Sequence, residues 1–243
     1  MNAQVTFLIA TRNTHKVEEI RAILGNQYRY LTLADFPNAP KVVEDAGTFA
    51  GNASKKAVEL AKWIIGTRNE KGGKGKAESR NEEFFVLADD SGLEVDALNG
   101  APGVHSARFA ALDSGRPDNS SDAENNAKLL GLLKDVPREK RTGRFRCVIT
   151  LTPVEVEIRN PKSEIRTSPV CYADELELQT EIFDGACEGR IDLAPRGKGG
   201  FGYDPLFIPN GVELSFAELG EDVKNKISHR SKALEKLKKR LTK

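Results

Sequence analysis

The sequence predicts an α/β domain built around a mixed β-sheet, and three observations support this fold class. Apolar runs of strand length alternate along the chain with segments whose apolar residues recur at helical spacing. Two alternating segments, residues 143–158 and 175–191, read as neighbouring strands of a long antiparallel hairpin. At 243 residues the chain accommodates one large domain or two small lobes with a substantial core.

Four elements are expected in the first half of the chain. "VTFLIA" reads as a buried strand, and "VEEIRAIL" after it reads as a helix. "TFAGNASKKAVELAKWII" reads as a second helix, and "FFVLADDSGLEVDAL" as a second apolar strand that ends in acidic residues. The apolar faces of the two helices consist of Val17, Ile20, Ile23 and Leu24 in the first, and Ala53, Ala57, Leu60 and Ile64 in the second.

The second half adds the hairpin and a C-terminal helix, "ISHRSKALEKLKKRLTK", whose apolar face consists of Ile227, Leu234, Leu237 and Leu241. Two stretches are expected to be insertions in a single domain that spans residues 1–243. Residues 68–81 are polar and rich in Gly and Lys, which predicts a loop. Residues 159–169 contain two prolines and are expected to extend the hairpin.

Composition excludes several classes of partner and places the protein in the cytoplasm. The formal net charge of +1 gives no overall attraction to nucleic acid, and no apolar run reaches the roughly 20 residues of a membrane span. The N-terminus lacks the features of a signal peptide. Cys147, Cys171 and Cys187 are odd in number and lack CxxC spacing, which indicates a reducing compartment without a disulfide framework or zinc site.

Basic residues occupy an unusual position in "TRNTHK", residues 11–16. Arg12, His15 and Lys16 lie where the first strand passes into a helix, and a helix N-terminus already carries about half a positive charge. The side chains could simply point into water. The alternative is that an anion belongs there, because free N–H groups flanked by Lys and Arg form a phosphate site.

The second cluster is "ADDSG", in which Asp89 and Asp90 are adjacent at the expected end of a strand. Asp, Ser and Gly also form ordinary turns. Next to a phosphate site, however, the carboxylates suggest Mg²⁺, which typically takes one or two carboxylates together with phosphate oxygens and waters. Glu44 is a candidate for a further carboxylate ligand.

The third cluster is "PRGKGGFGYDP", where Gly197, Gly199 and Gly202 match the spacing G-x-G-x-x-G. A dinucleotide site is not expected, because the pattern does not open a helix after a first strand. The glycines instead allow the backbone to approach a ligand closely, and Phe201 or Tyr203 can stack on a planar base or belong to the core.

The fourth cluster is "VKNKISHRSK", in which Ser228 is a plausible N-cap for the last helix. His229 and Arg230 would then occupy its first turn, where they can donate hydrogen bonds to an electron-rich edge of a ligand. A lysine-rich terminal helix is otherwise usually a solvated face.

Together and in this order, the clusters resemble the inosine triphosphate pyrophosphatase family, also called XTP/dITP diphosphatases. The resemblance extends from near the N-terminus to the last helix and is interrupted only at the two insertions. The segments that carry it are "FLIATRNTHKVEEI", "GTFAGNASKKA", "VLADDSGLEVDALNGAPGVHSARFA", "GKGGFGYDPLF" and "ISHRSKAL".

The resemblance implies two lobes around a long mixed β-sheet with flanking helices, an active cleft between the lobes, and commonly a homodimer. It implies Mg²⁺-dependent hydrolysis of ITP, dITP and XTP to nucleoside monophosphate and pyrophosphate. By position, Asp90 would be the proton acceptor and a metal ligand, and Glu44 would share the metal. The implied substrate-binding residues are Thr11, Arg12, Asn13, Thr14, His15, Lys16, Ser91, Phe201, Gly202, Tyr203, Asp204, Lys224, His229 and Arg230.

Two alternatives stay open at this point. One is a nucleoside triphosphate pyrophosphatase of different base preference, pyrimidine or general. The other is a non-catalytic nucleotide- or RNA-binding module that uses the basic loop and tail. Such a module has no need for the acidic "ADD" segment, which would repel phosphate unless a metal intervenes.

Overall fold

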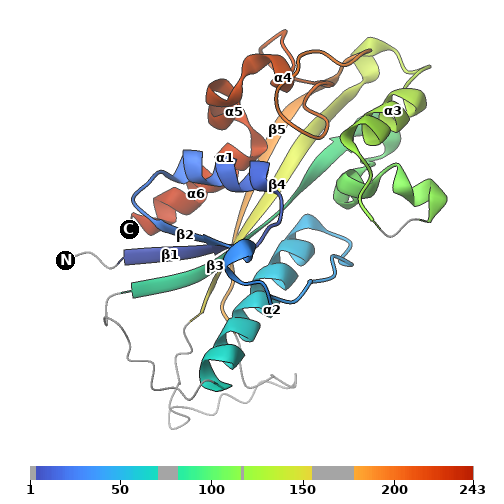
Figure 1. The fold of residues 1–243 in the computed structure, drawn as a ribbon. Helices are drawn as coiled ribbons and strands as arrows, with labels where there is room; N and C mark the ends of the chain where they lie inside the picture. Colours follow the sequence, from blue (N-terminus) through green and yellow to red (C-terminus); the bar gives the residue numbers. More distant parts are fainter. Residues whose placement is uncertain (1–3, 71–81, 116–117, 155–177, 243) are drawn as a thin grey trace, which may run out of the picture.

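The computed structural model describes residues 4–70, 82–115, 118–154 and 178–242. Its centre is a six-stranded sheet in the order β2-β1-β3-β4-β5-β6 (Figure 1). The strands are β1 (Gln4–Ile9), β2 (Arg29–Thr32), β3 (Glu82–Val95), β4 (Thr142–Pro153), β5 (Glu181–Ile191) and β6 (Phe207–Pro209).

The sheet is mixed, as the sequence predicts. Strand β1 runs parallel to both β2 and β3, whereas the pairs β3–β4, β4–β5 and β5–β6 are antiparallel. The expected hairpin is therefore confirmed for β4 and β5. Its tip and the predicted insertion at residues 159–169 lie outside the described residues.

The helices cover both faces of the sheet. They are α1 (Thr14–Leu24), α2 (Phe49–Glu70), α3 (Asp122–Leu132), α4 (Phe216–Leu219), α5 (Glu221–Ile227) and α6 (His229–Leu241), with short 3₁₀ turns at η1 (Leu33–Asp35), η2 (Asp96–Leu98), η3 (Gly103–Arg108), η4 (Ala111–Ser114) and η5 (Arg138–Lys140). Helices α1 and α6 lie together over one face, and α2 lies under the opposite face (Figure 1).

Buried apolar side chains form separate clusters in two lobes. The first lobe contains the clusters around α1, α2 and α6, and the second lobe contains the cluster at the far end of the long strands. One cluster joins α2 to the sheet and includes Leu60 and Val86; another joins α1 and α6 to it and includes Ile20 and Leu234. A third lies at the far end of the long strands, beside α3 and α4. That residues 1–243 form a single domain stays a prediction, supported by a sheet that runs through both lobes.

Two of the predicted boundaries are wrong. Helix α2 continues to Glu70, so residues 68–70 belong to the helix and not to an insertion; residues 71–81 lie outside the described residues. Strand β3 does not end at "ADDSG". It continues to Val95, because Asp89 to Val95 pair with β4, Asp90 opposite Val148. The acidic pair thus lies within a strand, not at a turn.

A close backbone approach sets the position of α6. A Cβ on Gly185 of β5 would lie 2.7 Å from the backbone nitrogen of Ala233 and would also overlap the carbonyl oxygen of His229. Only glycine therefore lets the first turns of α6 rest directly on β5. As Ser228 caps this helix, His229 and Arg230 occupy its first turn, as predicted. Among the described residues, no helix has the length and apolar character to cross a membrane.

Candidate active site

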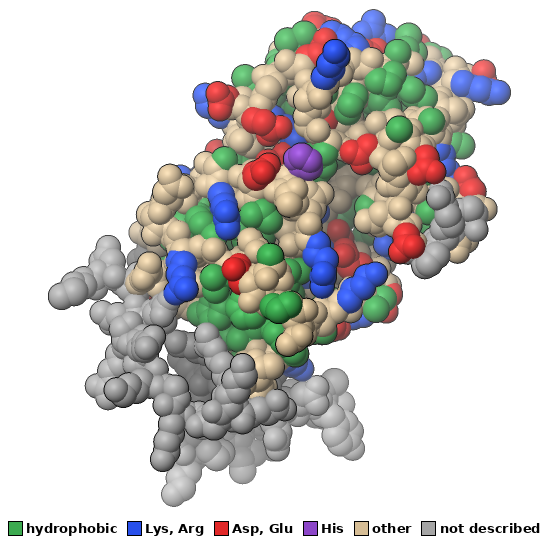
Figure 2. All heavy atoms as spheres, in the orientation of Figure 1, with side chains coloured by type: hydrophobic (Ala, Val, Ile, Leu, Met, Phe, Trp, Pro, Cys, Tyr) green, Lys and Arg blue, Asp and Glu red, His purple; other side chains and the backbone are tan. Residues whose placement is uncertain are grey.

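A pocket opens between the two lobes, and Figure 2 shows a recess there that acidic and basic side chains border. The space inside it, including the open mouth, is about 780 Å³. Residues from both lobes line it: Asn13, Lys16, Ser91, Gly92, Ser106, Ala107, Asn119, Ser120, Asp122, Asn125, Phe145, Phe201, Gly202, Tyr203, Asp204, Lys224, His229 and Arg230.

The "TRNTHK" segment forms the N-terminus of α1 at one side of this pocket. Asn13 is the N-cap, and its side-chain oxygen accepts a hydrogen bond from the backbone N–H of Lys16 at 3.2 Å. Of the six residues predicted to bind substrate there, Asn13 and Lys16 line the pocket. The other four, Thr11, Arg12, Thr14 and His15, lie outside the lining.

Asp89 compensates the charge of Lys16 within the protein. The Asp89 carboxylate is 1% exposed and accepts hydrogen bonds from Lys16, from Arg230 Nε at 3.1 Å and from the Cys147 thiol at 3.0 Å. Burial opposes ionisation, but Arg230 and Lys16 outweigh it and hold the pKa of Asp89 well below its usual range. Asp89 thus already balances part of the positive charge at this helix end, where the sequence predicts that an anion binds.

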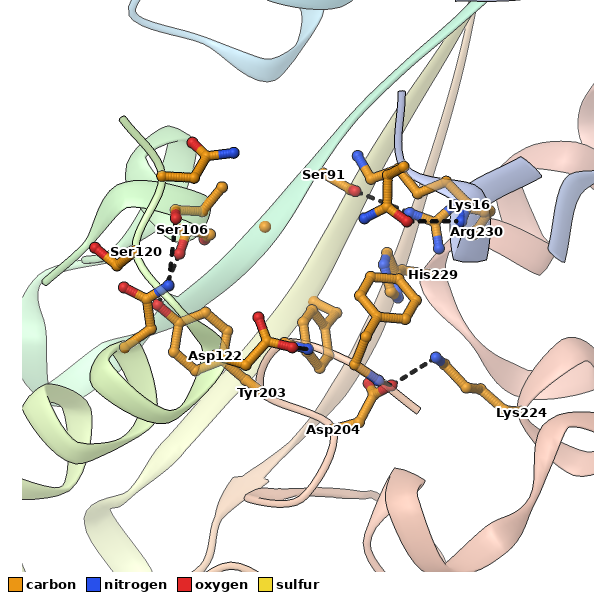
Figure 3. Close-up of a pocket in the computed structure, with 18 residues that line it drawn as sticks. Lys16, Ser91, Ser106, Ser120, Asp122, Tyr203, Asp204, Lys224, His229 and Arg230 are labelled. Atoms are coloured by element: carbon orange, nitrogen blue, oxygen red, sulfur yellow. Dashed lines mark hydrogen bonds and ion pairs between the residues drawn. The ribbon is translucent and has the colours of Figure 1, made fainter. Parts of the chain in front are cut away.

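The charge network continues behind Arg230. A second guanidinium nitrogen, Nη1, donates to Glu19 of α1, and Nη2 donates to the Ser91 hydroxyl at 3.0 Å. Lys224 Nζ lies 2.7 Å from Glu19 Oε1 and 2.6 Å from Asp204 Oδ2. The network thus connects α1, β3, α5 and α6 with the glycine-rich segment, and each guanidinium nitrogen of Arg230 already has a protein acceptor. Figure 3 shows the contacts of Arg230 with Ser91 and of Lys224 with Asp204.

Asp90 points to the opposite face of the sheet, toward α2. Its carboxylate accepts hydrogen bonds from the Asn52 amide at 3.0 Å and from the backbone N–H of Ser91 at 3.1 Å. Burial raises the pKa of Asp90, although Lys56 and Lys16 partly oppose the shift. A buried carboxylate with a raised pKa is suited to accept a proton. Asp90 itself is not among the lining residues; its neighbour Ser91 is.

Glu44 lies in the same region as Asp90. Lys56 Nζ donates to Glu44 Oε2 at 3.0 Å and to the backbone oxygen of Asp89 at 2.7 Å, and the charge of Glu44 contributes to the raised pKa of Asp90. The described residues contain no group of three or more His, Cys, Asp or Glu side chains that could hold a metal ion. Asp90 and Glu44 alone match the one or two carboxylates that Mg²⁺ typically takes when phosphate supplies other ligands.

The glycine-rich segment lies beside the N-terminus of α1. The ring of Phe201 is partly exposed and stacks on the His15 imidazole, with ring centroids 5.4 Å apart and planes 11° apart. Lys224 Nζ lies 4.5 Å from the centroid of the same ring. Tyr203 is buried, and its hydroxyl donates to the backbone oxygen of Ser106 at 2.9 Å, so this side chain belongs mainly to the core. Asp204 accepts from the backbone N–H of Phe201 at 2.9 Å.

His229 lies at the base of the pocket and stacks on Phe145, with centroids 4.8 Å apart. Burial and the neighbouring Arg230 hold the pKa of His229 well below its usual range. The ring is therefore neutral near pH 7 and donates from one nitrogen only. Its Nδ1 atom has no hydrogen-bond partner among the described residues.

Several lining residues were missed by the sequence reasoning. Ser106 comes from η3 of the second lobe, Asp122 and Asn125 come from α3, and Asn119 and Ser120 come from the segment before α3. Figure 3 shows Ser106, Ser120 and Asp122 across the pocket from Lys16 and Arg230. A signal for α3 is present in "SDAE", since Ser121 and Glu124 form a capping box. Ser106 and Asn119 carry no comparable local signal.

Fold and site together define a mixed-sheet α/β protein whose pocket combines a helix N-terminus, buried cations and an aromatic ring. The comparisons make the assignment specific: the chain belongs to the Ham1 family, whose model matches residues 7–240. This confirms the family resemblance drawn from the motifs.

Relatives match over nearly the whole chain. A dITP/XTP pyrophosphatase of Desulforamulus reducens is 43% identical over 230 residues, which cover 94% of this chain and 92% of the relative. One of Geobacter sulfurreducens is 42% identical, with 95% and 94% covered. Among solved structures, the Ham1 protein of Staphylococcus aureus is 30% identical with a TM-score of 0.70, and 98% of each chain is covered.

Proposed function

We propose that this protein hydrolyses the non-standard purine nucleoside triphosphates ITP, dITP and XTP to nucleoside monophosphate and pyrophosphate. The observation that carries the proposal is that one pocket combines Lys16 at the N-terminus of α1 with the aromatic ring of Phe201, which stacks on His15 of the same helix. This combination suits a ligand with a phosphate chain at one end and a planar base at the other. The 38–43% identical relatives are named dITP/XTP pyrophosphatases, which supports dITP and XTP as substrates.

The residues at the helix end would bind the phosphate chain. Lys16 supplies a half-buried cation that lines the pocket, and Asn13 caps the first turn of α1, whose other N–H groups would be available to phosphate oxygens. Ser91 adds a hydroxyl beside Arg230. Charge develops on the departing pyrophosphate in the transition state, and fixed positive groups at this place would stabilise it.

Asp90 would accept the proton of the attacking water. Its raised pKa suits the carboxylate to accept a proton, the charge of Lys16 acts on it, and its neighbour Ser91 lines the pocket. Asp90 and Glu44 would hold Mg²⁺, with Lys56 placing the Glu44 carboxylate. The metal would neutralise charge on the phosphate oxygens.

Base selectivity would come from donors at the edge of the pocket. Hypoxanthine and xanthine present a 6-oxo acceptor where adenine presents an amino donor. Lys224 and Arg230 are donors only, and the neutral His229 ring donates from one nitrogen. Lys224 and Arg230 already have protein acceptors, so a 6-oxo group would accept from their remaining N–H groups or from His229, whereas an adenine amino group facing these donors would gain no such hydrogen bond.

Two finer proposals concern the assembly and the compartment. We propose a homodimer, supported by the family resemblance, which a molar mass measured by light scattering would test. We propose a cytoplasmic location, supported by the free thiols of Cys147 and Cys187. Detection of this enzyme's activity in a periplasmic or secreted fraction would contradict the cytoplasmic location.

Product analysis tests the reaction itself. Incubation of ITP with enzyme and Mg²⁺ should yield IMP and pyrophosphate in equal amounts, and a chelator should stop the reaction. IDP and inorganic phosphate as products would contradict cleavage between the α and β phosphoryl groups. Binding of ITP without any hydrolysis would favour a nucleotide-binding module instead.

A further inference from the structure

We propose that Asp122 and Asn126 of α3 are positioning residues that hold the Phe201 ring in place for stacking on the base. The proposal rests on the proposed function of the pocket. Neither residue contacts the charge network around Arg230, and both act through the backbone of Gly202.

Both polar backbone groups of Gly202 are held by α3. The Gly202 N–H donates to Asp122 Oδ2 at 2.7 Å, and the Asn126 amide donates to the Gly202 carbonyl oxygen at 3.0 Å. Asp122 and Asn126 are one helical turn apart, so both side chains project from the same face of the helix. The loop residue between them is a glycine with φ of +62°, a conformation that other residues rarely adopt.

Helix α3 is a firm attachment point for this loop. Ser121 and Glu124 close its N-terminus with a capping box, and the Asn125 amide binds two backbone groups of the second lobe, the N–H of Ala110 at 2.8 Å and the oxygen of Ala107 at 3.3 Å. The loop is therefore attached at Gly202 to the second lobe, while Asp204 connects it to Lys224 on the opposite side.

The contacts of α3 with Gly202 should therefore affect binding of the base and not binding of the phosphates. Phe201 directly precedes Gly202, so the orientation of the Gly202 peptide sets where the ring points. If the peptide is released, the ring loses its fixed orientation, and the site must order it again whenever a base binds. Since stacking contributes equally to the bound substrate and the transition state, KM should rise while kcat stays within about twofold.

The experiment compares Asp122→Ala, Asn126→Ala and the control Ser121→Ala. The first two remove one loop contact each, whereas Ser121→Ala removes the cap of α3 and leaves both contacts in place. We expect KM for ITP to rise about tenfold in Asp122→Ala, with a smaller rise in Asn126→Ala. Asp122→Asn keeps an acceptor oxygen and should restore most of the lost affinity.

A second readout does not depend on activity. Amide hydrogen exchange in residues 200–204 should speed up at least tenfold in Asp122→Ala and stay at the wild-type rate in Ser121→Ala. Unchanged exchange in Asp122→Ala would overturn the proposal, as would faster exchange with an unchanged KM. An equal rise of KM in Ser121→Ala would mean that α3 stability, and not the loop contact, is responsible. Absence of ITP hydrolysis by the wild type would instead refute the proposed function, and the exchange rates would still test the loop contact.

Discussion

Asp89 and Asp90 are consecutive residues of β3, and their carboxylates lie on opposite faces of the sheet in opposite electrostatic surroundings. Asp89 faces α1 and α6 and binds Lys16 and Arg230, which lower its pKa. Asp90 faces α2, accepts a hydrogen bond from Asn52, and has a pKa raised by burial. One carboxylate is thus a structural anion that holds cations in place, and the other is available for chemistry.

Asp89→Asn should lower the free energy of unfolding by about 3 kcal/mol at pH 7, because it leaves the buried Arg230 and the half-buried Lys16 without their shared anion. The folded pKa of Asp89 is depressed, so its contribution is present above the unfolded value of about 3.9 and is lost as pH falls through the folded pKa. Urea titrations at pH 7 and at pH 3 measure this. An unchanged midpoint at pH 7 would show that the ion pairs contribute nothing.

Asp90→Asn should abolish turnover and, without metal, raise the free energy of unfolding at pH 7. The folded pKa of Asp90 is raised, so the folded state binds more protons and wild-type stability falls as pH rises from about 3.9 through the folded pKa. The asparagine does not titrate and avoids this loss. Melting curves and pyrophosphate release check both effects. Retention of more than a few per cent of activity would remove Asp90 from the catalytic role.

Lys16→Ala should reduce kcat/KM for ITP by about a hundredfold, because the cation contacts phosphate both in the bound substrate and in the transition state. Arg12→Ala in the same segment is the matched comparison, since Arg12 is exposed and lies outside the pocket lining. We expect the smaller loss of kcat/KM for Arg12→Ala when both variants are measured by steady-state kinetics at saturating Mg²⁺. Equal effects of the two substitutions would mean that the segment attracts phosphate only through its overall charge.

Gly185→Ala should destabilise the protein by about 2 kcal/mol and reduce activity, because the added methyl group overlaps the backbone of α6 at His229 and Ala233. The overlap pushes Arg230 away from Asp89. Gly131→Ala in α3 is the control, because no described atom lies within 4 Å of its added Cβ, and alanine there should be neutral or slightly stabilising. Thermal melts compare the two. A Gly185→Ala protein as stable and active as the wild type would show that α6 can shift without loss.

The elements with strong periodicity were predictable from the sequence. The apolar spacing of Ile20 and Leu24, and of Leu234 and Leu237, gives α1 and α6 correctly, and alternation gives β4 and β5. Periodicity could not show where β3 ends, because Asp, Ser and Gly favour turns locally and only the pairing with β4 keeps residues 89–92 extended. Strand β2 is too short and too exposed to give a signal.

The candidate site was predictable where a local motif carries it. Lys16, Ser91, Phe201, Lys224, His229 and Arg230 all line one pocket. The sequence could not show that Arg230 is already bound to Asp89 and Glu19, since these partners lie 141 and 211 residues away along the chain. Nor could it show the contact between Asp122 and Gly202, which exists only because α3 packs beside the pocket.

The most direct test of the whole account is the specificity constant for a panel of nucleotides. Pyrophosphate release from ITP, dITP, XTP, GTP and ATP is measured with Mg²⁺ under identical conditions. We expect kcat/KM for ITP, dITP and XTP to exceed that for ATP by roughly two orders of magnitude or more, because the pocket edge consists of donors. GTP shares the 6-oxo group and should be poor, but less strongly rejected than ATP. Equal kcat/KM for ITP and ATP would contradict the account.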